Sequence, residues 1–181
     1  VVGYIIYFQD ISGLWIPLDT VFGLLNTNFT TYNANPQNKI ETFSVVAFDA
    51  LGNNSIRSSA HSTIFVNNSY EKCDTSVFLD WNPYLNMVAM EAYQLKIIRE
   101  DLTTGTMFPE ETIDLAKEDT SFLMPVDYSS NYTIWLEATS KASYVSKSNR
   151  VLFASTEINI PTFSYVNRVP VEAENRIKVT S

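Results

Sequence analysis

The sequence is poor in the residues on which many enzymes and small cross-linked domains depend. Its 181 residues include one cysteine, one histidine and five glycines. The single cysteine, Cys73, cannot form a disulfide within the chain, which excludes a disulfide-stapled scaffold. The glycines are scattered and form no phosphate-binding loop. No apolar run approaches the ~20 residues of a membrane-spanning helix, so we expect no membrane insertion.

Basic side chains are also scarce. The chain has 12 Lys and Arg against 20 Asp and Glu, which gives a formal net charge of -8. Such an acidic surface repels phosphate backbones and anionic head groups, so we expect neither nucleic acid nor a membrane surface as a partner. Apolar residues make up 45% of the chain, which is enough to form a normal core and excludes global disorder.

What the sequence has instead favours strands. It contains 18 Ser, 17 Thr, 16 Asn and 24 aromatic residues. Ser, Thr and Asn compete with the helix backbone for hydrogen bonds, whereas Thr and aromatic residues suit a pleated surface. Apolar and polar residues alternate over Val77–Trp81, Tyr93–Ile97 and Tyr132–Ala138. The best helical candidate, Met87–Leu95, is short and flanked by strand patterns, so we expect a loop or a single turn. The sequence predicts an all-β fold.

An internal repeat of roughly 90–100 residues, the size of a small β-sandwich, organises the chain. Three pairs of segments match at offsets of 89, 91 and 100: Gly3–Ile6 with Ala92–Leu95, Glu41–Ala47 with Tyr132–Ala138, and Val77–Trp81 with Ile177–Ser181. Each Ala that ends the middle match precedes a polar hairpin and then a predicted Ser/Asn-rich strand, Ser55–Val66 in one copy and Ser146–Ser155 in the other.

The segments Val77–Pro83, Tyr93–Leu95 and Tyr132–Ala138 resemble the second, third and sixth strands of the fibronectin type III family. The resemblance implies antiparallel, immunoglobulin-like β-sandwiches of seven strands joined in tandem. It also implies that Trp81 is buried and that the Tyr132 hydroxyl pins a neighbouring loop. In the first copy Glu41 stands at the position of that tyrosine, so we expect the corresponding hydrogen bond to be missing there.

The resemblance also divides the chain. Residues 1–66 are expected to form an incomplete domain that lacks its first two strands, and residues 67–155 a complete one. Residues 156–181 match the first strands of a following domain. Since unpaired sheet edges invite strand addition, this tail is a candidate to complete residues 1–66 of another molecule, which would give a strand-exchanged homo-oligomer.

The phrases Ala47–Ser55 and Leu79–Tyr84 resemble fibronectin type III repeats in large exported proteins of Bacteroidota. This implies an extracellular or cell-surface location and a structural or adhesive spacer, with other domains of the same protein and a protein or glycan ligand as partners. The alternative is an accessory module of a secreted carbohydrate-active enzyme whose catalytic domain lies outside this chain. A cytokine-receptor ectodomain would want paired cysteines and a Trp-Ser-x-Trp-Ser box, and the sequence has neither.

The sequence predicts no catalytic residue, no cofactor and no metal site. His61 has no partner pattern for a general base, Cys73 has no CxxC spacing, and adjacent carboxylates such as Glu110 and Glu111 do not converge across a cleft. Four Asn-x-Ser/Thr sequons, at Asn28, Asn53, Asn67 and Asn131, arise readily in so Asn-rich a chain. The candidates for surface contacts are aromatic residues in predicted loops or edges: Trp15, Tyr84, Phe108, Tyr128 and Tyr144. The alternative for these five is packing at the sandwich ends or between domains.

Overall fold

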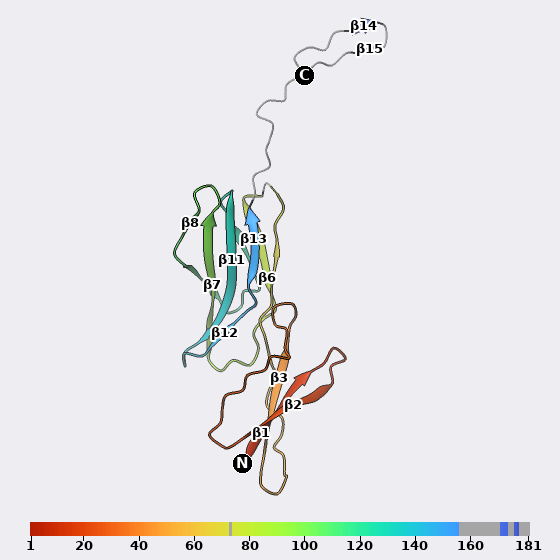
Figure 1. The fold of residues 1–181 in the computed structure, drawn as a ribbon, viewed down its shortest axis with the longest axis vertical. Coiled ribbons are helices and arrows are strands. Elements are labelled where there is room, and N and C mark those ends of the chain that lie inside the picture. The colour runs from red at the N-terminus through yellow and green to blue at the C-terminus, as the bar shows by residue number, and fades with distance from the viewer. Residues whose placement is uncertain (73, 156–170, 174–175, 178–181) are drawn as a thin grey trace.

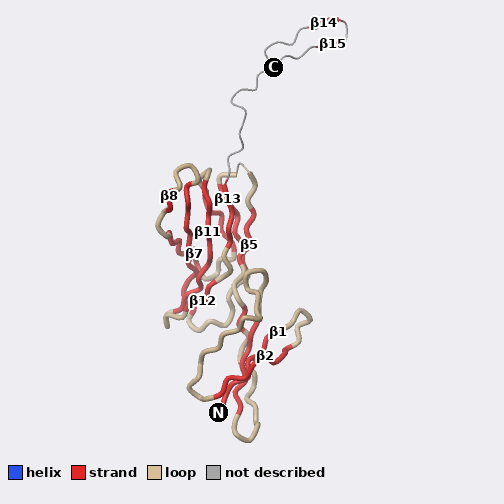
Figure 2. Tube along the Cα trace, in the orientation of Figure 1, coloured by secondary structure: helices blue, strands red, loops and turns tan. Residues whose placement is uncertain are grey.

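The computed structural model describes residues 1–72, 74–155, 171–173 and 176–177. These residues form strands, turns and loops and contain no helix, as Figure 2 shows. None of them therefore forms a helix that is long and apolar enough to cross a membrane. All strand pairs are antiparallel. The prediction of an all-β, antiparallel fold is confirmed. Cys73 lies outside the described residues.

The first part of the chain forms one four-stranded sheet, which we call the first sheet. Its strands lie in the order β2-β1-β3-β4. Their bounds are β1 Gly3–Gln9, β2 Trp15–Phe22, β3 Thr42–Phe48 and β4 His61–Ser62. Figure 1 shows these strands grouped near the N-terminus. Residues 23–41, which connect β2 to β3, contain no strand.

The middle of the chain forms two sheets, which we call together the sandwich. One sheet has the order β10-β6-β5, built from β5 Val66–Ser69, β6 Ser76–Trp81 and β10 Ser121–Pro125. The other is centred on β7 Met90–Asp101 and β11 Ser130–Ser140. Its outer strands are β8 Thr106–Met107, β9 Glu111–Ala116, β12 Val145–Lys147 and β13 Val151–Ser155. This is the immunoglobulin-like sandwich, with the strand arrangement of fibronectin type III domains.

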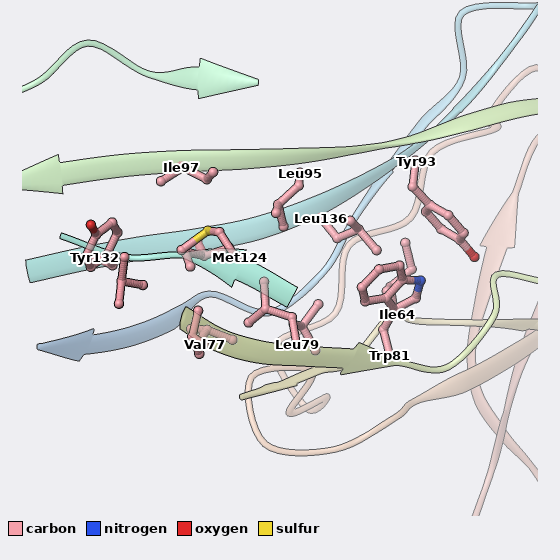
Figure 3. Close-up of a cluster of buried hydrophobic side chains, with 14 of the residues drawn as sticks. Ile64, Val77, Leu79, Trp81, Tyr93, Leu95, Ile97, Met124, Tyr132 and Leu136 are labelled. Atoms are coloured by element: carbon pink, nitrogen blue, oxygen red, sulfur yellow. The ribbon is translucent and has the colours of Figure 1, made fainter. Parts of the chain in front are cut away.

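The core lies between these two sheets. Figure 3 shows Val77, Leu79 and Trp81 on one sheet pointing toward the opposite sheet, which carries Leu95 and Leu136. These five side chains are between 0% and 4% exposed, because alternate residues of each strand face inward. Trp81 packs edge-on against Tyr93, with ring centroids 5.8 Å apart. The implied burial of Trp81 is therefore confirmed, and Tyr93 and Tyr132 are buried with it, whereas Phe43 of the first sheet is only half-buried.

The register of the first sheet follows that of the sandwich. Tyr4 pairs with Ala47 on β1 and β3, and Ile6 pairs with Val45. The offsets of 89 and 91 carry these pairs onto Tyr93 with Ala138 and Leu95 with Leu136, which are the pairs found between β7 and β11. β1 and β3 therefore hold the same relative positions as the two central strands of the sandwich.

The first sheet differs from the sandwich in its missing cover. No second sheet faces it among the described residues, since β5, β6 and β10 all belong to the sandwich. Ile64 and Val66 also pack in the sandwich core, so the chain enters that core before the predicted boundary at residues 66 and 67. Of the predicted third unit, 156–181, the structure describes only β14 Val171–Ala173 and β15 Arg176–Ile177, which pair with each other.

The predicted Ser/Asn-rich strands, Ser55–Val66 and Ser146–Ser155, are wrong in their extent. Each is interrupted where a serine hydroxyl takes the place of a backbone acceptor. In the first copy the Val45 N–H donates to Ser58 Oγ at 3.0 Å, and in the second the Leu136 N–H donates to Ser148 Oγ at 2.9 Å. These side-chain bonds break the ladder, so only the short strands β4, β12 and β13 and the start of β5 remain.

The Tyr132 hydroxyl pins the loop before β11, as the resemblance implied. It accepts a hydrogen bond from the Asp127 N–H at 2.7 Å, and the Tyr132 side chain is 4% exposed. Burial raises the pKa of this phenol above its ordinary value, so the hydroxyl is protonated at neutral pH.

We expect Tyr132→Phe to lower the free energy of unfolding by about 1 kcal/mol, because the Asp127 N–H loses its acceptor while the ring stays packed. Urea unfolding measures this change. Tyr144→Phe, on a side chain that is 65% exposed, is the matched control and should leave stability unchanged. Equal stability of the two variants would contradict a role for the hydroxyl.

The expectation that the first copy lacks this hydrogen bond is wrong. Glu41 is 5% exposed, and its carboxylate accepts a hydrogen bond from the Asn35 N–H at 2.8 Å. Lys39 lies 3.1 Å from the same oxygen. A carboxylate is long enough and accepts strongly enough to hold the preceding loop as the phenol does in the sandwich.

Glu41→Ala should therefore release the loop before β3. We expect about tenfold faster amide hydrogen exchange at Asn35, since the loss of a hydrogen bond to a charged acceptor costs about 1.5 kcal/mol or more. Hydrogen exchange followed by NMR measures it. Lys39→Ala removes only the exposed partner of the ion pair and should change exchange less than about twofold. If the lysine variant exchanged as fast as the glutamate variant, the ion pair would be what holds the loop.

Candidate junction groove

The linker that leads from the first sheet into the sandwich, residues 63–66 with Val66 already the first residue of β5, is held by asparagine side chains. Asn82 Oδ1 accepts from the Phe65 N–H at 2.8 Å, and Asn82 Nδ2 donates to the Thr63 carbonyl at 3.1 Å. Asn149 does the same one residue further on: it accepts from the Val66 N–H at 2.6 Å and donates to the Val66 carbonyl at 3.0 Å. The two amides thus supply the backbone partners that a neighbouring strand would give.

The first sheet holds the other side of the linker. The Thr63 N–H donates to the Glu41 carbonyl at 2.8 Å, and the Glu41 N–H donates to Thr63 Oγ1 at 2.9 Å. Asn86, in the loop between β6 and β7, donates from Nδ2 to the Ala60 carbonyl at 2.6 Å. The linker is therefore bonded to both units, and its path is fixed by short hydrogen bonds on either side.

A groove lies beside this junction. Its volume is about 330 Å³, and it is lined by residues from β4, from the loop between β6 and β7, and from β12 with the turn before it: His61, Tyr84, Asn86, Met87, Val88, Tyr144, Val145 and Ser146. The His61 and Tyr84 rings are 6.1 Å apart. None of these lining residues is Asp, Glu, Lys or Arg: Met87, Val88 and Val145 give the groove aliphatic surface, and its polar groups are uncharged hydroxyl and amide groups and the His61 imidazole.

The groove is open to solvent on its apolar side. Val88 is 78% exposed, Tyr144 is 65% exposed and Val145 is 51% exposed. Two residues of the loop between β6 and β7 adopt a left-handed backbone conformation, Asn86 with φ of 66° and Ala89 with φ of 52°. A left-handed conformation is uncommon for Ala, and the two residues flank the segment Met87–Val88, which lines the groove.

The structure distributes the five predicted surface aromatics over different places. Tyr84 and Tyr144 come together in the junction groove. Arg57 lies over the Trp15 ring at 4.9 Å, and Arg99 lies over the Phe108 ring at 3.7 Å. These stacked guanidinium groups cover part of the ring faces that a ligand would use. Tyr128 is 39% exposed and its carbonyl accepts from Ser130 Oγ.

Charged groups gather elsewhere on the sandwich. Arg99 forms an ion pair with Asp127 beside a pocket of about 650 Å³ that Phe108 and Tyr132 also line. On β11, Glu137 accepts from Lys147 at 2.7 Å and from the Trp135 indole at 3.0 Å. Burial alone would raise the pKa of Glu137, but these two hydrogen bonds outweigh it and hold the pKa below its ordinary value. Among the described residues no three His, Cys, Asp or Glu side chains gather as a metal site would require.

The sequence pattern alone missed the residues that build the junction. Asn82 stands in an Asn-Pro turn signal and Asn149 in a Ser/Asn-rich segment, so both read as ordinary turn and strand residues. Met87 and Val88 read as part of a loop. The bonds from Asn149 to Val66 join residues 83 positions apart, and no local pattern signals a contact at that separation.

Asn149→Ala should destabilise the sandwich by about 2–3 kcal/mol, because it leaves both backbone groups of buried Val66 without partners. Asn82→Ala should cost less, about 1–2 kcal/mol, since its site is only half-buried. Urea unfolding followed by tryptophan fluorescence measures both. Asn68→Ala, on an exposed position of β5, is the control and should be neutral. A neutral Asn149→Ala would show that water replaces the amide at no cost.

Comparisons with known proteins match this chain to solved structures only. No protein-family model matches the chain, and no curated protein matches it. Among solved structures the chain is similar to the FN1–FN3 domains of chicken CNTN1, with a TM-score of 0.41 and 17% identity over 86% of this chain and 54% of that one. It is also similar to the pectate lyase Pel3 of Pectobacterium carotovorum, with a TM-score of 0.35 and 22% identity over 51% of this chain and 26% of that one. A second crystal structure of Pel3 gives a TM-score of 0.35 and 18% identity, over 57% and 29%. The chain thus spans less than two thirds of each of these proteins. At TM-scores below 0.5 the likenesses carry no argument about function.

Proposed function

We propose that this chain is a non-enzymatic structural and adhesive module that sets the distance and angle between neighbouring parts of a multidomain protein and binds a protein ligand at the junction groove. The observation that carries the proposal is that the linker is hydrogen-bonded both to the first sheet and to the sandwich. Asn82 and Asn149 hold it to the sandwich, and Glu41 and Thr63 hold it to the first sheet. Such a linker transmits orientation, whereas a solvated one would act as a flexible tether.

The lining of the groove favours protein as the ligand. Fully or partly exposed Val88, Val145 and Met87 offer aliphatic surface, and Tyr84 and Tyr144 add aromatic rings with a polar edge. Tyrosine, methionine and other apolar residues at the centre of a patch are typical of protein interfaces, where charged residues are depleted. A sugar ring would use aromatic faces together with several charged or amide side chains, and only Asn86 of that kind lines the groove.

The proposal also includes the cellular location of the module and its arrangement in the parent protein. The resemblance to tandem fibronectin type III repeats of exported Bacteroidota proteins favours a secreted or cell-surface location. The matching register of β1–β3 and β7–β11 supports a tandem arrangement of related units. The alternative, an accessory module of a secreted carbohydrate-active enzyme, differs in its ligand, which would be a glycan.

Selection of a displayed random peptide library on the immobilised chain tests the groove, with a glycan array run in parallel. We expect peptides rich in aliphatic and aromatic residues to bind. Tyr144→Ala and Val88→Asp should each weaken the selected peptides about tenfold or more, since both remove exposed contact surface without touching the core. Isothermal titration calorimetry measures the affinities.

Leu152→Ala is the matched control, because Leu152 is 70% exposed on β13 and does not line the groove. Its affinity should equal that of the parent chain. Peptides that bind the Tyr144→Ala and Val88→Asp variants as tightly as the parent would remove the groove from the proposal. Binding of glycans with no peptide binding would overturn the protein ligand in favour of the accessory-module alternative.

A further inference from the structure

β12, which lines one side of the junction groove, is an edge strand of the sandwich. It pairs with β11 and with no other strand among the described residues. An edge strand presents a row of backbone N–H and C=O groups with which a further chain can pair. The groove therefore offers a ligand backbone groups as well as side chains.

The register with β11 identifies the free backbone groups of β12. The Tyr144 carbonyl accepts a hydrogen bond from β11 at 3.1 Å, and the Ser148 N–H donates one to β11 at 2.8 Å. Hydrogen-bonded and non-hydrogen-bonded pairs alternate along an antiparallel ladder, so Ser146 bonds to β11, whereas Val145 and Lys147 direct their backbone groups away from it. Two N–H and two C=O groups thus face the open side of β12, and no described residue bonds to them.

The two faces of β12 offer different side-chain contacts. Ser146 lines the groove and is paired with Ala138, whose side chain is buried in the core. Lys147 is paired with Glu137 and points to the opposite face, since side chains alternate along a strand. Its side chain is 65% exposed. A peptide strand beside β12 would therefore direct alternate side chains toward the groove and toward Lys147.

The segment around β12 is basic, although the whole chain has a net charge of -8. Residues 138–155 contain Lys141, Lys147 and Arg150 and no Asp or Glu. Lys147 pairs with Glu137 of β11, but Lys141 and Arg150 form no ion pair with a described residue. No acidic side chain lines the groove. This edge of the sandwich therefore favours a ligand that carries carboxylates.

We propose that the ligand of the junction groove is an extended acidic peptide that adds to β12 as a further strand. This inference rests on the proposed function, because it specifies the conformation and charge of the protein ligand at the same groove. The peptide backbone bonds to Val145 and Lys147, and apolar side chains of the peptide enter the groove beside Met87 and Val88. Asp or Glu side chains at the alternate positions lie near Lys147. Since β12 is short, the groove contacts supply the affinity that backbone pairing alone would not.

Amide hydrogen exchange of the full chain, followed by NMR with and without a bound peptide, tests the strand. The probes are the peptides that the displayed library yields on the immobilised chain. At saturating peptide we expect the Val145 and Lys147 N–H groups to exchange about tenfold more slowly, because each gains an acceptor. The Ser146 N–H is the internal control. It already bonds to β11, so its exchange should change less than about threefold.

The outcomes separate this inference from the proposed function. Unchanged exchange at Val145 and Lys147, in a complex that Val88→Asp weakens, would overturn the added strand and leave the groove as the ligand site. A library without binders, or with binders that Val88→Asp does not weaken, would remove the groove as a protein site and the added strand with it.

Backbone N-methylation of a selected peptide distinguishes a strand from a helix. Methyl groups at every second residue of the bound stretch should weaken binding about tenfold or more, because alternate N–H groups of an added strand face β12. Methyl groups at the residues between them should weaken it less than about threefold. Isothermal titration calorimetry measures the affinities. Equal losses at consecutive residues would indicate a helix, in which every internal N–H is bonded, and would overturn the proposal.

Lys147→Gln tests the acidic character of the ligand. It removes one charge beside the groove and keeps the backbone N–H, so it should weaken the selected peptides about threefold. Lys117→Gln is the matched control, because Lys117 lies in the turn after β9 and away from the groove. Its affinity should equal that of the parent chain. Equal affinities of the two variants would overturn the requirement for carboxylates in the ligand.

Discussion

The structure depends on the way in which side-chain amides complete the backbone hydrogen bonds of residues 63–66. An extended segment that leaves one sheet and enters another has no continuous strand beside it, and buried backbone groups without partners are costly. Asn82 and Asn149 each offer one donor and one acceptor at the spacing of a strand, so the segment keeps its bonds while it changes sheets. The position of Ile64 and Val66 in the core follows from this path, as does the groove beside it.

The two units show what a single sheet needs from its surroundings. In the sandwich, β7 and β11 are buried on their inner face by a second sheet, and the aromatic and aliphatic side chains between them reach zero exposure. The first sheet has the same central pairing and a comparable apolar face, but among the residues that the structure describes the connection 23–41 is what lines the pockets against that face. The same local pairing therefore gives a closed core in the sandwich and open pockets against the first sheet.

The repeat also shows how different side chains can perform one structural task. The loop before β11 is held by the Tyr132 hydroxyl, and the loop before β3 by the Glu41 carboxylate. The family pattern has a tyrosine at this position, so it predicted that the hydrogen bond would be missing at Glu41. The glutamate carboxylate also provides an acceptor atom, which a comparison of residue types does not take into account. The serines at 58 and 148 illustrate the reverse: the same side chain breaks the strand in both copies through the same kind of bond.

The sequence by itself determined the all-β fold, the central strands and the inward positions Val77, Leu79, Trp81, Tyr93 and Tyr132, because a period of two with bulky apolar residues has a stable outcome only in a half-buried sheet. The structure adds that the matched segments share one register, since the pairs of β1 with β3 repeat those of β7 with β11. Only the tertiary structure decided which surface residues meet. Tyr84 and Tyr144 share a groove while Trp15 and Phe108 lie under arginines, and Asn149 reaches Val66 across the sandwich. Those contacts join residues that are distant along the chain. They depend on how the strands and loops are arranged in three dimensions, which the local alternation of apolar and polar residues does not reveal.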